Sequence, residues 1–496
     1  MTSLALLITQ VPIPLIVLLS AVAILLPLVG RYTKDRGGVD PSPKITLIAL
    51  TLGIAYVSFA ALRGIGTPIS SPVLSWDLFS LFFTFIFLIV GIIITLASFT
   101  IEAKSINSEV FYSLLLFTTV GMILVALAQD LLMLFIAWSL VSVSTYALAG
   151  LRKDALSAEG AMKYFVISAL SSAIILYAIS LLYGVTGTTN IPEIISKVAL
   201  LSPDARPLMA IASILLLAGF GFKMGIVPFH MWLPDTYEGI PPSVSALLAG
   251  GTKSMGFVAF IKVTVLLGPL LVVQMNIQWG MTLAVLALVT MTLGNVAALT
   301  QKSLTRLLAY SSIAHAGYIL IGLAVIGQAS SSVDQLGLGS SLFHILNHAV
   351  LTAGAFIAAM VILSKVGGLS LDSLKGLGKR MPITAFSLSI ILLALAGIPP
   401  LSAFWSKAFL FSAALQADLA WLALAGVLNS AFSLAYYAIV IKKMYMEKST
   451  TTARIKEPSS VVAALLIVVI LTIGIGLAFG PSLSASIEAA LPVLSP

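Results

Sequence analysis

Residues 215–239 read LLLAGFGFKMGIVPFHMWLPDTYEG, an apolar run that is interrupted by Lys223 and then by Pro228. The same combination returns at 393–411, LALAGIPPLSAFWSKAFLF, where Lys407 follows two adjacent prolines. A lysine at the centre of a bilayer-spanning helix costs about 3 kcal/mol on insertion scales. A proline inside such a helix frees backbone carbonyls that lipid cannot satisfy. The two stretches therefore predict broken membrane helices that handle charge inside the bilayer.

The composition is that of a membrane protein. The 496 residues are 59% hydrophobic and only 9% charged, whereas soluble domains carry about 25% charged residues. Apolar stretches of about 20 residues, the length that crosses a bilayer core, recur along the chain. We expect an all-α polytopic fold with about fourteen transmembrane helices. The expected spans are about 11–30, 43–62, 77–100, 110–128, 131–150, 161–184, 207–228, 240–265, 278–299, 306–327, 339–363, 383–414 (interrupted), 419–441 and 460–480.

The basic residues alternate between the two sides of these spans. Of the 26 lysines and arginines, nineteen follow odd-numbered spans, three (Arg63, Lys197, Arg206) follow even-numbered spans, and four lie inside spans. This bias is the positive-inside rule, so the net charge of +8 indicates membrane orientation and no nucleic-acid partner. We expect a multi-pass protein of the cell membrane, in contact with lipid, with both termini outside.

Cofactor chemistry inside this chain is limited by its composition. The chain has no cysteine, which excludes thiolate-held iron–sulfur clusters, c-type haem and disulfides. We find no dinucleotide or P-loop motif, the nearest approach being GLGKR at 376–380. We therefore expect no cofactor in this chain and assign any redox group to partner subunits.

The chain reads as one integral domain, 1–496, with an internal repeat. Tyr146-Ala-Leu-Ala-Gly ends the fifth span and Tyr318-Ile-Leu-Ile-Gly ends the tenth, and two spans after each comes a proline-broken, lysine-bearing helix. An offset of five spans inverts the second copy in the membrane, and paired broken helices in inverted repeats mark the ion path of many transporters. The predicted copies are about 110–265 and 278–445, flanked by 1–100 and 460–496.

Three intramembrane lysines are candidates for a proton path. Lys223 and Lys407 adjoin the two breaks, where a buried amine beside a hydrated gap could exchange its proton. Lys253 lies near the middle of the eighth span among glycines that leave room for water or a close helix. Snorkelling toward one interface is the competing interpretation of Lys223, and it is the preferred interpretation of Lys262.

The histidines give a weaker signal. His344 and His348 are four residues apart and share one helix face. That spacing suits a metal, but no acid or cysteine lies nearby in sequence, so we favour a proton-relay or structural role. A structural and a relay role fit His315 equally.

The segment after the first break carries His230, Asp235 and Glu238. We expect these three residues at the inner surface. They could guide protons to Lys223, or they could cap the next helix or contact a partner, and the sequence favours neither interpretation.

Three stretches together resemble a known family. They are PFHMWLPDTYEG followed by IPPSVSALLAGGTKSMGF (228–257), QKSLTRLLAYSSIAHAGYILIG (301–322) and LALAGIPPLSAFWSKAFLF (393–411). They are similar to the antiporter-like membrane subunits of respiratory complex I, and PDTYEG most resembles subunit N of NADH–quinone or deazaflavin-dependent oxidoreductases. The resemblance covers about 75–445.

The resemblance implies fourteen helices, two inverted five-helix repeats and broken helices 7 and 12. It implies that Lys223, Lys253 and Lys407 take part in proton translocation along a hydrophilic axis. Partner subunits of the membrane arm would surround the chain. Flavin, iron–sulfur clusters and quinone would be held by partners.

The chain departs from the family pattern at two positions. The family carries a glutamate on helix 5 that pairs with the helix 7 lysine, and here the stretch FIAWSLVSVSTYALAG places Ser139 there. A serine cannot hold a negative charge, so another subunit or lipid supplies it, or this half-channel is altered. Thr352 stands where many relatives have a lysine, and His344 and His348 are then the candidates to carry the relay.

We expect a proton-translocating subunit of an NADH–quinone or related oxidoreductase, an enzyme subunit without its own redox centre. Cation/proton antiporters and membrane-bound hydrogenases are one alternative, although sodium sites often use carboxylate ligands, and the spans contain no acidic residue in their interior. A stand-alone solute carrier is another. A scaffold subunit whose pumping is impaired by Ser139 is a third.

Overall fold

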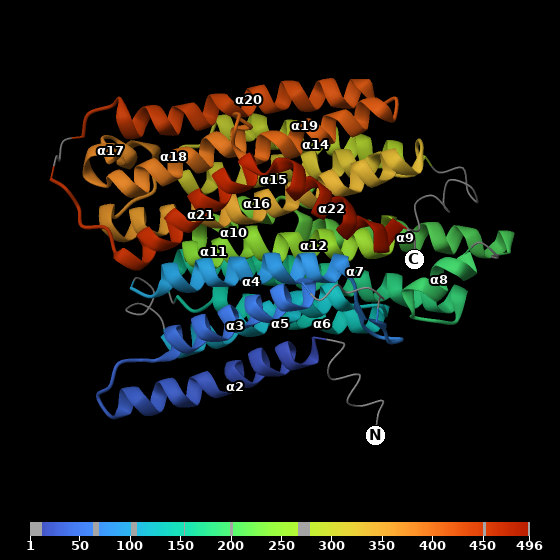
Figure 1. The fold of residues 1–496 in the computed structure, drawn as a ribbon, viewed down its shortest axis with the longest axis horizontal. Helices are drawn as coiled ribbons and strands as arrows, with labels where there is room; N and C mark the ends of the chain where they lie inside the picture. Colours follow the sequence, from blue (N-terminus) through green and yellow to red (C-terminus); the bar gives the residue numbers. More distant parts are fainter. Residues whose placement is uncertain are drawn as a thin grey trace.

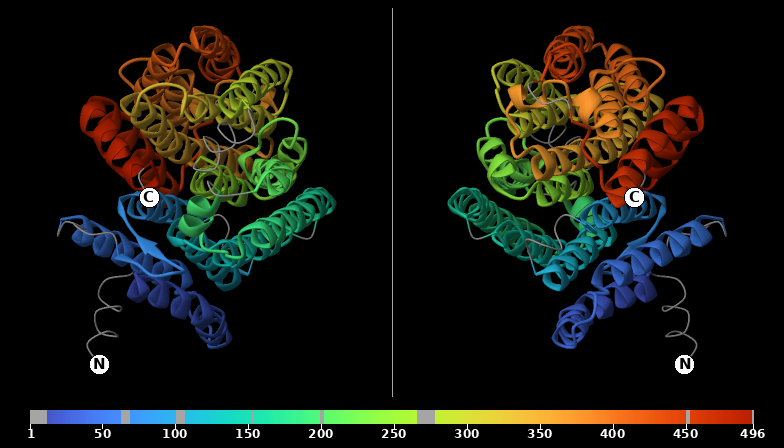
Figure 2. Two further views of the ribbon diagram at one scale, coloured as in Figure 1. Left: turned by 90° about the vertical axis from the view of Figure 1, so that its right-hand side faces the viewer. Right: turned by 90° about the vertical axis from the view of Figure 1, so that its left-hand side faces the viewer.

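The computed structural model describes residues 12–62, 69–100, 107–152, 154–198, 202–265, 278–449 and 453–494. Both chain termini lie outside these described residues, and so do the basic residues Arg63, Lys104 and Lys153. The described chain forms a bundle of long helices that run side by side, with α2 (Ile13–Asp35) at one edge and α20 (Ala420–Tyr445) at the other (Figures 1 and 2).

The helices and strands follow one another along the chain in three groups. The first comprises α2 (Ile13–Asp35), α3 (Ser42–Leu62), β1 (Ile69–Ser70), β2 (Ser75–Trp76), α4 (Leu78–Ser98), α5 (Ser108–Leu127), α6 (Leu131–Ala149) and α7 (Ala155–Thr186). The second comprises α8 (Ile191–Val198), η2 (Pro203–Ala205), α9 (Arg206–Met224), α10 (Trp232–Gly239), α11 (Pro242–Leu247), η3 (Leu248–Thr252), α12 (Lys253–Phe260), η4 (Ile261–Val265), α14 (Trp279–Leu299), α15 (Leu304–Ala324) and α16 (Ser331–Val366). The third comprises η5 (Leu371–Leu374), α17 (Leu377–Arg380), α18 (Pro382–Ala396), α19 (Ser402–Gln416), α20 (Ala420–Tyr445), α21 (Ser459–Leu477) and α22 (Phe479–Leu494).

The chain is an all-α, multi-pass membrane protein. Thirteen helices within the described residues are long and apolar enough to cross a membrane, and α18 is a shorter apolar helix. Each of the fourteen predicted spans overlaps one of these helices, although the number of true membrane crossings stays a prediction. The sheet formed by the described residues is the short antiparallel pair β1–β2.

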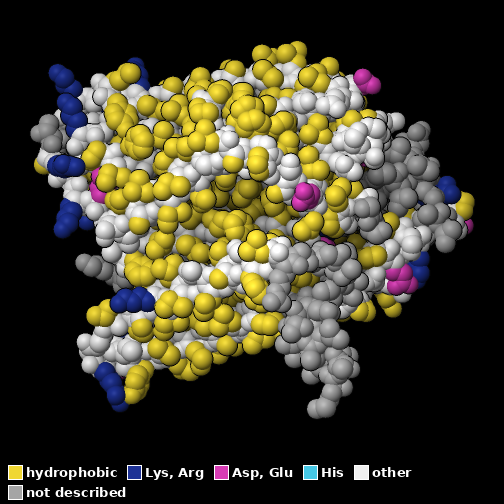
Figure 3. Space-filling view, viewed as in Figure 1, with side chains coloured by type: hydrophobic (Ala, Val, Ile, Leu, Met, Phe, Trp, Pro, Cys, Tyr) yellow, Lys and Arg dark blue, Asp and Glu magenta, His cyan; other side chains and the backbone are white. Residues whose placement is uncertain are grey.

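The outer surface matches a lipid environment. Hydrophobic side chains cover the length of the helices, and lysines and arginines gather at the end where α2 and α20 finish and α17 lies (Figure 3). Lys34, Lys379 and Lys442 belong to these helix ends.

Three aspartates that precede spans are N-caps, because Asp77, Asp130 and Asp154 accept backbone N–H groups of α4, α6 and α7.

The centre of the bundle is formed by the continuous segment Pro242–Val263 together with α15 and α16, which are almost entirely buried. These are the elements that carry Lys253 and three of the four histidines. A π-helical turn, η3, directly precedes Lys253. Such turns occur frequently at functional sites.

The chain is interrupted where proline predicted it. α9 ends at Met224 and is followed by Gly225 (φ +68°) and a cis Val227–Pro228 bond. α18 ends at Ala396 and is followed by Gly397 (φ +89°) and a cis Pro399–Pro400 bond. Both glycines occupy the left-handed region, where a side chain is strained.

The sixth predicted span, about 161–184, lies within a longer helix. α7 begins at Ala155, where Asp154 caps it. Glu159 and Lys163 therefore lie in its first turns and form an ion pair of 2.8 Å across one helical turn.

Candidate functional site

Lys223 lies in the last turn of α9 and is 3% exposed. Its Nζ donates to the Tyr164 hydroxyl at 3.3 Å. The same nitrogen lies 5.1 Å from the ring centroid of Trp138 and 5.6 Å from that of Tyr164. The amine is therefore held by two aromatic rings and one hydroxyl.

Lys253 begins α12 and is also buried. Its Nζ donates to the backbone carbonyl and, at 2.8 Å, to the hydroxyl of Ser312 on α15. The Ser312 hydroxyl lies 3.2 Å from Nε2 of His348 on α16. The hydroxyl accepts from the lysine, and we assign its proton to Nε2 of His348, which accepts it when the imidazole is neutral.

Lys253, Ser312 and His348 form the first half of a line of polar contacts. His315 and His344, on α15 and α16, form its second half. His315 Nδ1 and His344 Nε2 are 3.0 Å apart, and His344 Nδ1 lies 2.8 Å from the Ser406 hydroxyl of α19. That hydroxyl donates to the Ala403 carbonyl at 3.2 Å. The serine therefore accepts from His344 Nδ1–H, and His344 Nε2 in turn accepts from His315 Nδ1–H.

These assignments orient both halves of the line in one direction, from Lys253 toward Ser406. The junction between the halves is not a hydrogen bond: the rings of His348 and His315 have centroids 5.4 Å apart. His315 Nε2 is buried there with no hydrogen-bond partner among the described residues. The Nε2 nitrogen of His315 can therefore accept a proton at the junction, next to the half of the line that begins at Lys253.

Lys407 follows Ser406 in α19 and is 3% exposed. Its Nζ donates to the carbonyls of Leu395 at 2.9 Å and Ala396 at 3.3 Å, and to Ser430 at 3.0 Å. The two carbonyls are the free C-terminal groups of α18, the negative end of its dipole. The break that exposes them thus stabilises the ammonium.

The two breaks approach the lysines closely. A Cβ on Gly397 would lie 3.3 Å from Cδ of Lys407, and a Cβ on Gly225 would lie 3.5 Å from Nζ of Lys253. A Cβ on Gly256 would lie 3.1 Å from Cβ of Lys223. The structure therefore places Lys223 and Lys253 on adjoining helices, although no hydrogen bond between described atoms joins their amines.

Ser139 is partly exposed on α6, beside the fully buried Trp138. Within the described residues, no carboxylate forms an ion pair with Lys223 or with any other lysine buried in the spans. Thr352 is buried on α16, one turn beyond His348. The departure at Ser139 is therefore not compensated by an acid in the described part of this chain.

Lys262 extends to the end of a span, although its amine stays inside the protein. The residue is 7% exposed, and its Nζ donates at 2.8 Å to the carbonyl of Ala128, the C-cap of α5. The lysine anchors that helix end.

The three residues predicted at the inner surface, His230, Asp235 and Glu238, do not share one set of contacts. Asp235 and Glu238 lie on α10 and both bind Arg306 Nη1, at 2.7 and 3.2 Å. Asp235 also accepts from Lys163 at 2.8 Å, and mainly this hydrogen bond lowers the pKa of its carboxyl. His230 is buried apart from both.

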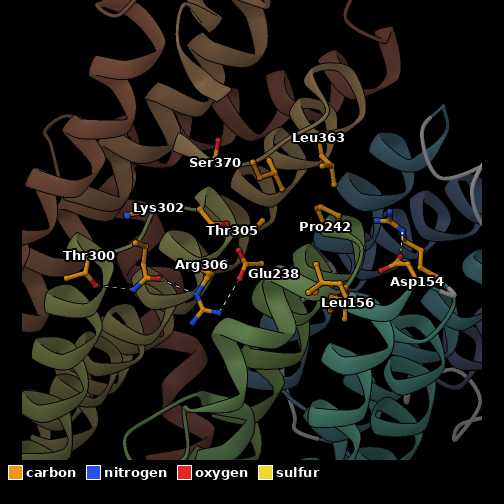
Figure 4. Close-up of a pocket in the computed structure, with 16 residues that line it drawn as sticks. Asp154, Leu156, Glu238, Pro242, Thr300, Lys302, Thr305, Arg306, Leu363 and Ser370 are labelled. Carbon is orange, nitrogen blue, oxygen red and sulfur yellow. Dashed lines mark hydrogen bonds and ion pairs between the residues drawn. The ribbon is translucent and has the colours of Figure 1, made fainter. Parts of the chain in front are cut away.

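This cluster borders a cavity of about 680 Å³. Glu238 and Arg306 face each other on one side, and Lys302 and Thr300 lie nearby (Figure 4). In the described residues, no group of three histidine or acidic side chains could hold a metal ion.

The sequence analysis did not identify four residues that take part in these buried contacts. Tyr164, Trp138, Ser312 and Ser406 act across helix interfaces, and single polar or aromatic residues in an apolar span carry no periodic signal. His315 had an available signal, since it lies three residues after Ser312 and therefore on the same helix face.

The fold and these buried amines define a membrane protein that handles charge inside the bilayer. The family described as NADH:quinone oxidoreductase/Mrp antiporter, TM (transmembrane), matches residues 128–433, and the chain belongs to this family.

Two relatives and one solved structure are similar over most of the chain. F(420)H(2) dehydrogenase subunit N of Methanosarcina mazei is 44% identical over 459 residues, 90% of each chain. NADH-quinone oxidoreductase subunit N of Trichlorobacter lovleyi is 40% identical over 80% of each. A chain of respiratory complex I from Thermus thermophilus is 29% identical with a TM-score of 0.77, covering 95% of this chain and 98% of that one.

Proposed function

We propose that this chain is a proton-translocating membrane-arm subunit of a quinone oxidoreductase, most similar to subunit N. The observation that carries the proposal is the oriented line Lys253–Ser312–His348 and His315–His344–Ser406, which ends beside Lys407. It lies in the most buried part of a fold shared with complex I subunits.

The line can move a proton by hydroxyl and imidazole exchange. A proton leaving the Lys253 ammonium passes through the Ser312 hydroxyl to His348, which becomes cationic. Transfer across the junction protonates His315 Nε2, and its Nδ1 proton then shifts to His344 and on toward Ser406. Each ring accepts on one nitrogen and releases from the other. Lys223 loads this line from the side of the first break.

The surrounding complex is part of the proposal. The relatives are subunits of F420H2 and NADH oxidoreductases, so we assign flavin, iron–sulfur clusters and quinone to partner subunits of this chain. The lysine-rich end would face the cytoplasm across a cell membrane, with both termini outside. We also propose that about 110–265 and 278–445 are inverted repeats within one domain, with α9–α10 and α18–α19 as the broken helices.

A test compares Lys253→Met and Lys407→Met with Lys262→Met in the intact complex, reconstituted in liposomes. Lys262 is a matched control because it is equally buried but lies off the line. The two line variants should lose most protons moved per electron while assembly and electron transfer persist. Unchanged stoichiometry in both would refute the relay.

The same preparation separates the alternatives. Co-purification with flavin and iron–sulfur subunits would support the oxidoreductase. Co-purification with small membrane subunits and no redox protein would support a cation/proton antiporter. A native complex that transfers electrons without moving protons through this chain would identify a scaffold.

A further inference from the structure

Lys223 differs from the other three buried lysines in what holds its amine. Lys253, Lys262 and Lys407 each donate to at least one backbone carbonyl. The described contacts of the Lys223 amine are the Tyr164 hydroxyl and the faces of Trp138 and Tyr164. A desolvated ammonium needs a source of negative potential, and here the aromatic faces are the nearest one.

The tyrosine hydroxyl is oriented to accept from the lysine. Tyr164 Oη lies 2.8 Å from Thr145 Oγ1. The threonine proton is used by the carbonyls of Val141 and Ser142, at 2.7 and 3.0 Å. Thr145 therefore accepts the Tyr164 proton, which leaves the phenolic lone pairs directed toward Lys223.

Both rings are fixed by aromatic packing. Tyr164 lies between Tyr146 and Trp232, with ring centroids 5.1 Å away on each side. Trp138 packs on Phe220 at 5.4 Å. The indole N–H of Trp138 is buried with no hydrogen-bond partner among the described residues. The chain thus uses the face of this ring and not its donor.

We propose that Trp138 and Tyr164 form an aromatic cradle, a pair of positioning residues that stabilises the Lys223 ammonium where the chain supplies no carboxylate. The cradle spans α6 and α7 and closes over the last turn of α9, so it defines where the charged amine rests before the proton leaves. This inference rests on the proposed function, because it assigns how the first lysine of the proton path is held.

Fluorinated tryptophans test the cradle without changing its shape. Fluorine withdraws charge from the ring face and weakens cation–π attraction while it preserves packing. We would install mono- to tetrafluorotryptophan at position 138 in the intact complex and measure protons moved per electron in liposomes. A stepwise loss, roughly three- to tenfold across the series, is expected from the size of a buried cation–π contact.

Trp279 is the matched control. It is 6% exposed, and its indole N–H also lacks a partner among the described residues, but no cation is found over its ring there. Fluorination of the tryptophan at position 279 should leave the number of protons moved per electron unchanged. A flat series at 138, or equal slopes at both positions, would overturn the cradle.

Two further variants separate the cradle from the proposed function. Tyr164→Phe keeps the ring and should retain more translocation than Tyr164→Leu; equal losses would overturn the role of the ring face. Lys223→Met should abolish translocation. If it does so while the fluorine series is flat, the cradle alone fails. If it leaves translocation intact, the proposed role of Lys223 fails, and the cradle with it.

Discussion

His315 and His344 share a hydrogen bond of 3.0 Å between Nδ1 and Nε2, and their rings lie 13° from parallel. The bond joins α15 to α16 in the most buried part of the bundle. It joins two buried histidines in one hydrogen-bonded line, along which, in the proposed function, the first ring passes a proton to the second.

We therefore expect His315→Leu to lower protons moved per electron severalfold. The variant removes both the donor to His344 and the free acceptor at the junction. His344→Leu should have a similar effect, and the double variant should be no worse than either single one, since both break the same line. Fully additive losses in reconstituted vesicles would show that the two rings act on separate paths.

Ser139→Glu should restore part of the translocation lost in Trp138→Leu. A carboxylate next to the cradle supplies the negative charge that the lost ring face provided. Proton transport per electron is measured in the single and double variants. Ser139→Gln has nearly the same shape without the charge and should restore nothing; equal recovery by the amide would contradict the electrostatic explanation.

Gly397→Ala should impair both stability and transport. The residue has φ +89°, and its Cβ would lie 3.3 Å from Lys407 Cδ. Forcing an L-residue into this region costs about 1–2 kcal/mol.

Gly187→Ala is its control, because Gly187 has φ +69° with nothing within 4 Å of a Cβ. Both variants should lower the melting temperature. Only Gly397→Ala should reduce protons moved per electron, and a transport loss of the same size in Gly187→Ala would show that backbone strain alone is responsible.

Asp235 should contribute to stability above acidic pH. Its folded-state pKa is depressed below the ordinary 3.8, first by the Lys163 hydrogen bond and further by Arg306. The contribution is therefore complete above pH 3.8 and is lost as pH falls through the folded value.

Because the carboxyl is 37% exposed, the contribution after solvent screening should be less than about 1 kcal/mol. The melting temperature of Asp235→Asn should lie below that of the parent at pH 7, and the two should converge only when the pH falls below the depressed folded-state pKa. A difference that persists or grows in acid would contradict this linkage.

The fold could be read from the sequence because its signals are long and local. Apolar runs predicted the long helices of the bundle, and Pro228 and the 399–400 pair lie close to the ends of α9 and α18. The lysines could be named because charge in an apolar span is rare. Their partners could not, since Ser312 and Tyr164 act through contacts between helices far apart in sequence. The acceptor of Lys262 could not be named for the same reason, because the carbonyl of Ala128 belongs to another helix.

The lack of a described carboxylate beside the buried lysines governs how many protons the line can hold. Carbonyl dipoles and aromatic faces stabilise a cation without cancelling its charge. Two neighbouring cations in this low-dielectric interior therefore repel each other almost unscreened. In the proposed proton path, adjacent groups are therefore not charged at the same time, and one proton must move on before the next can enter.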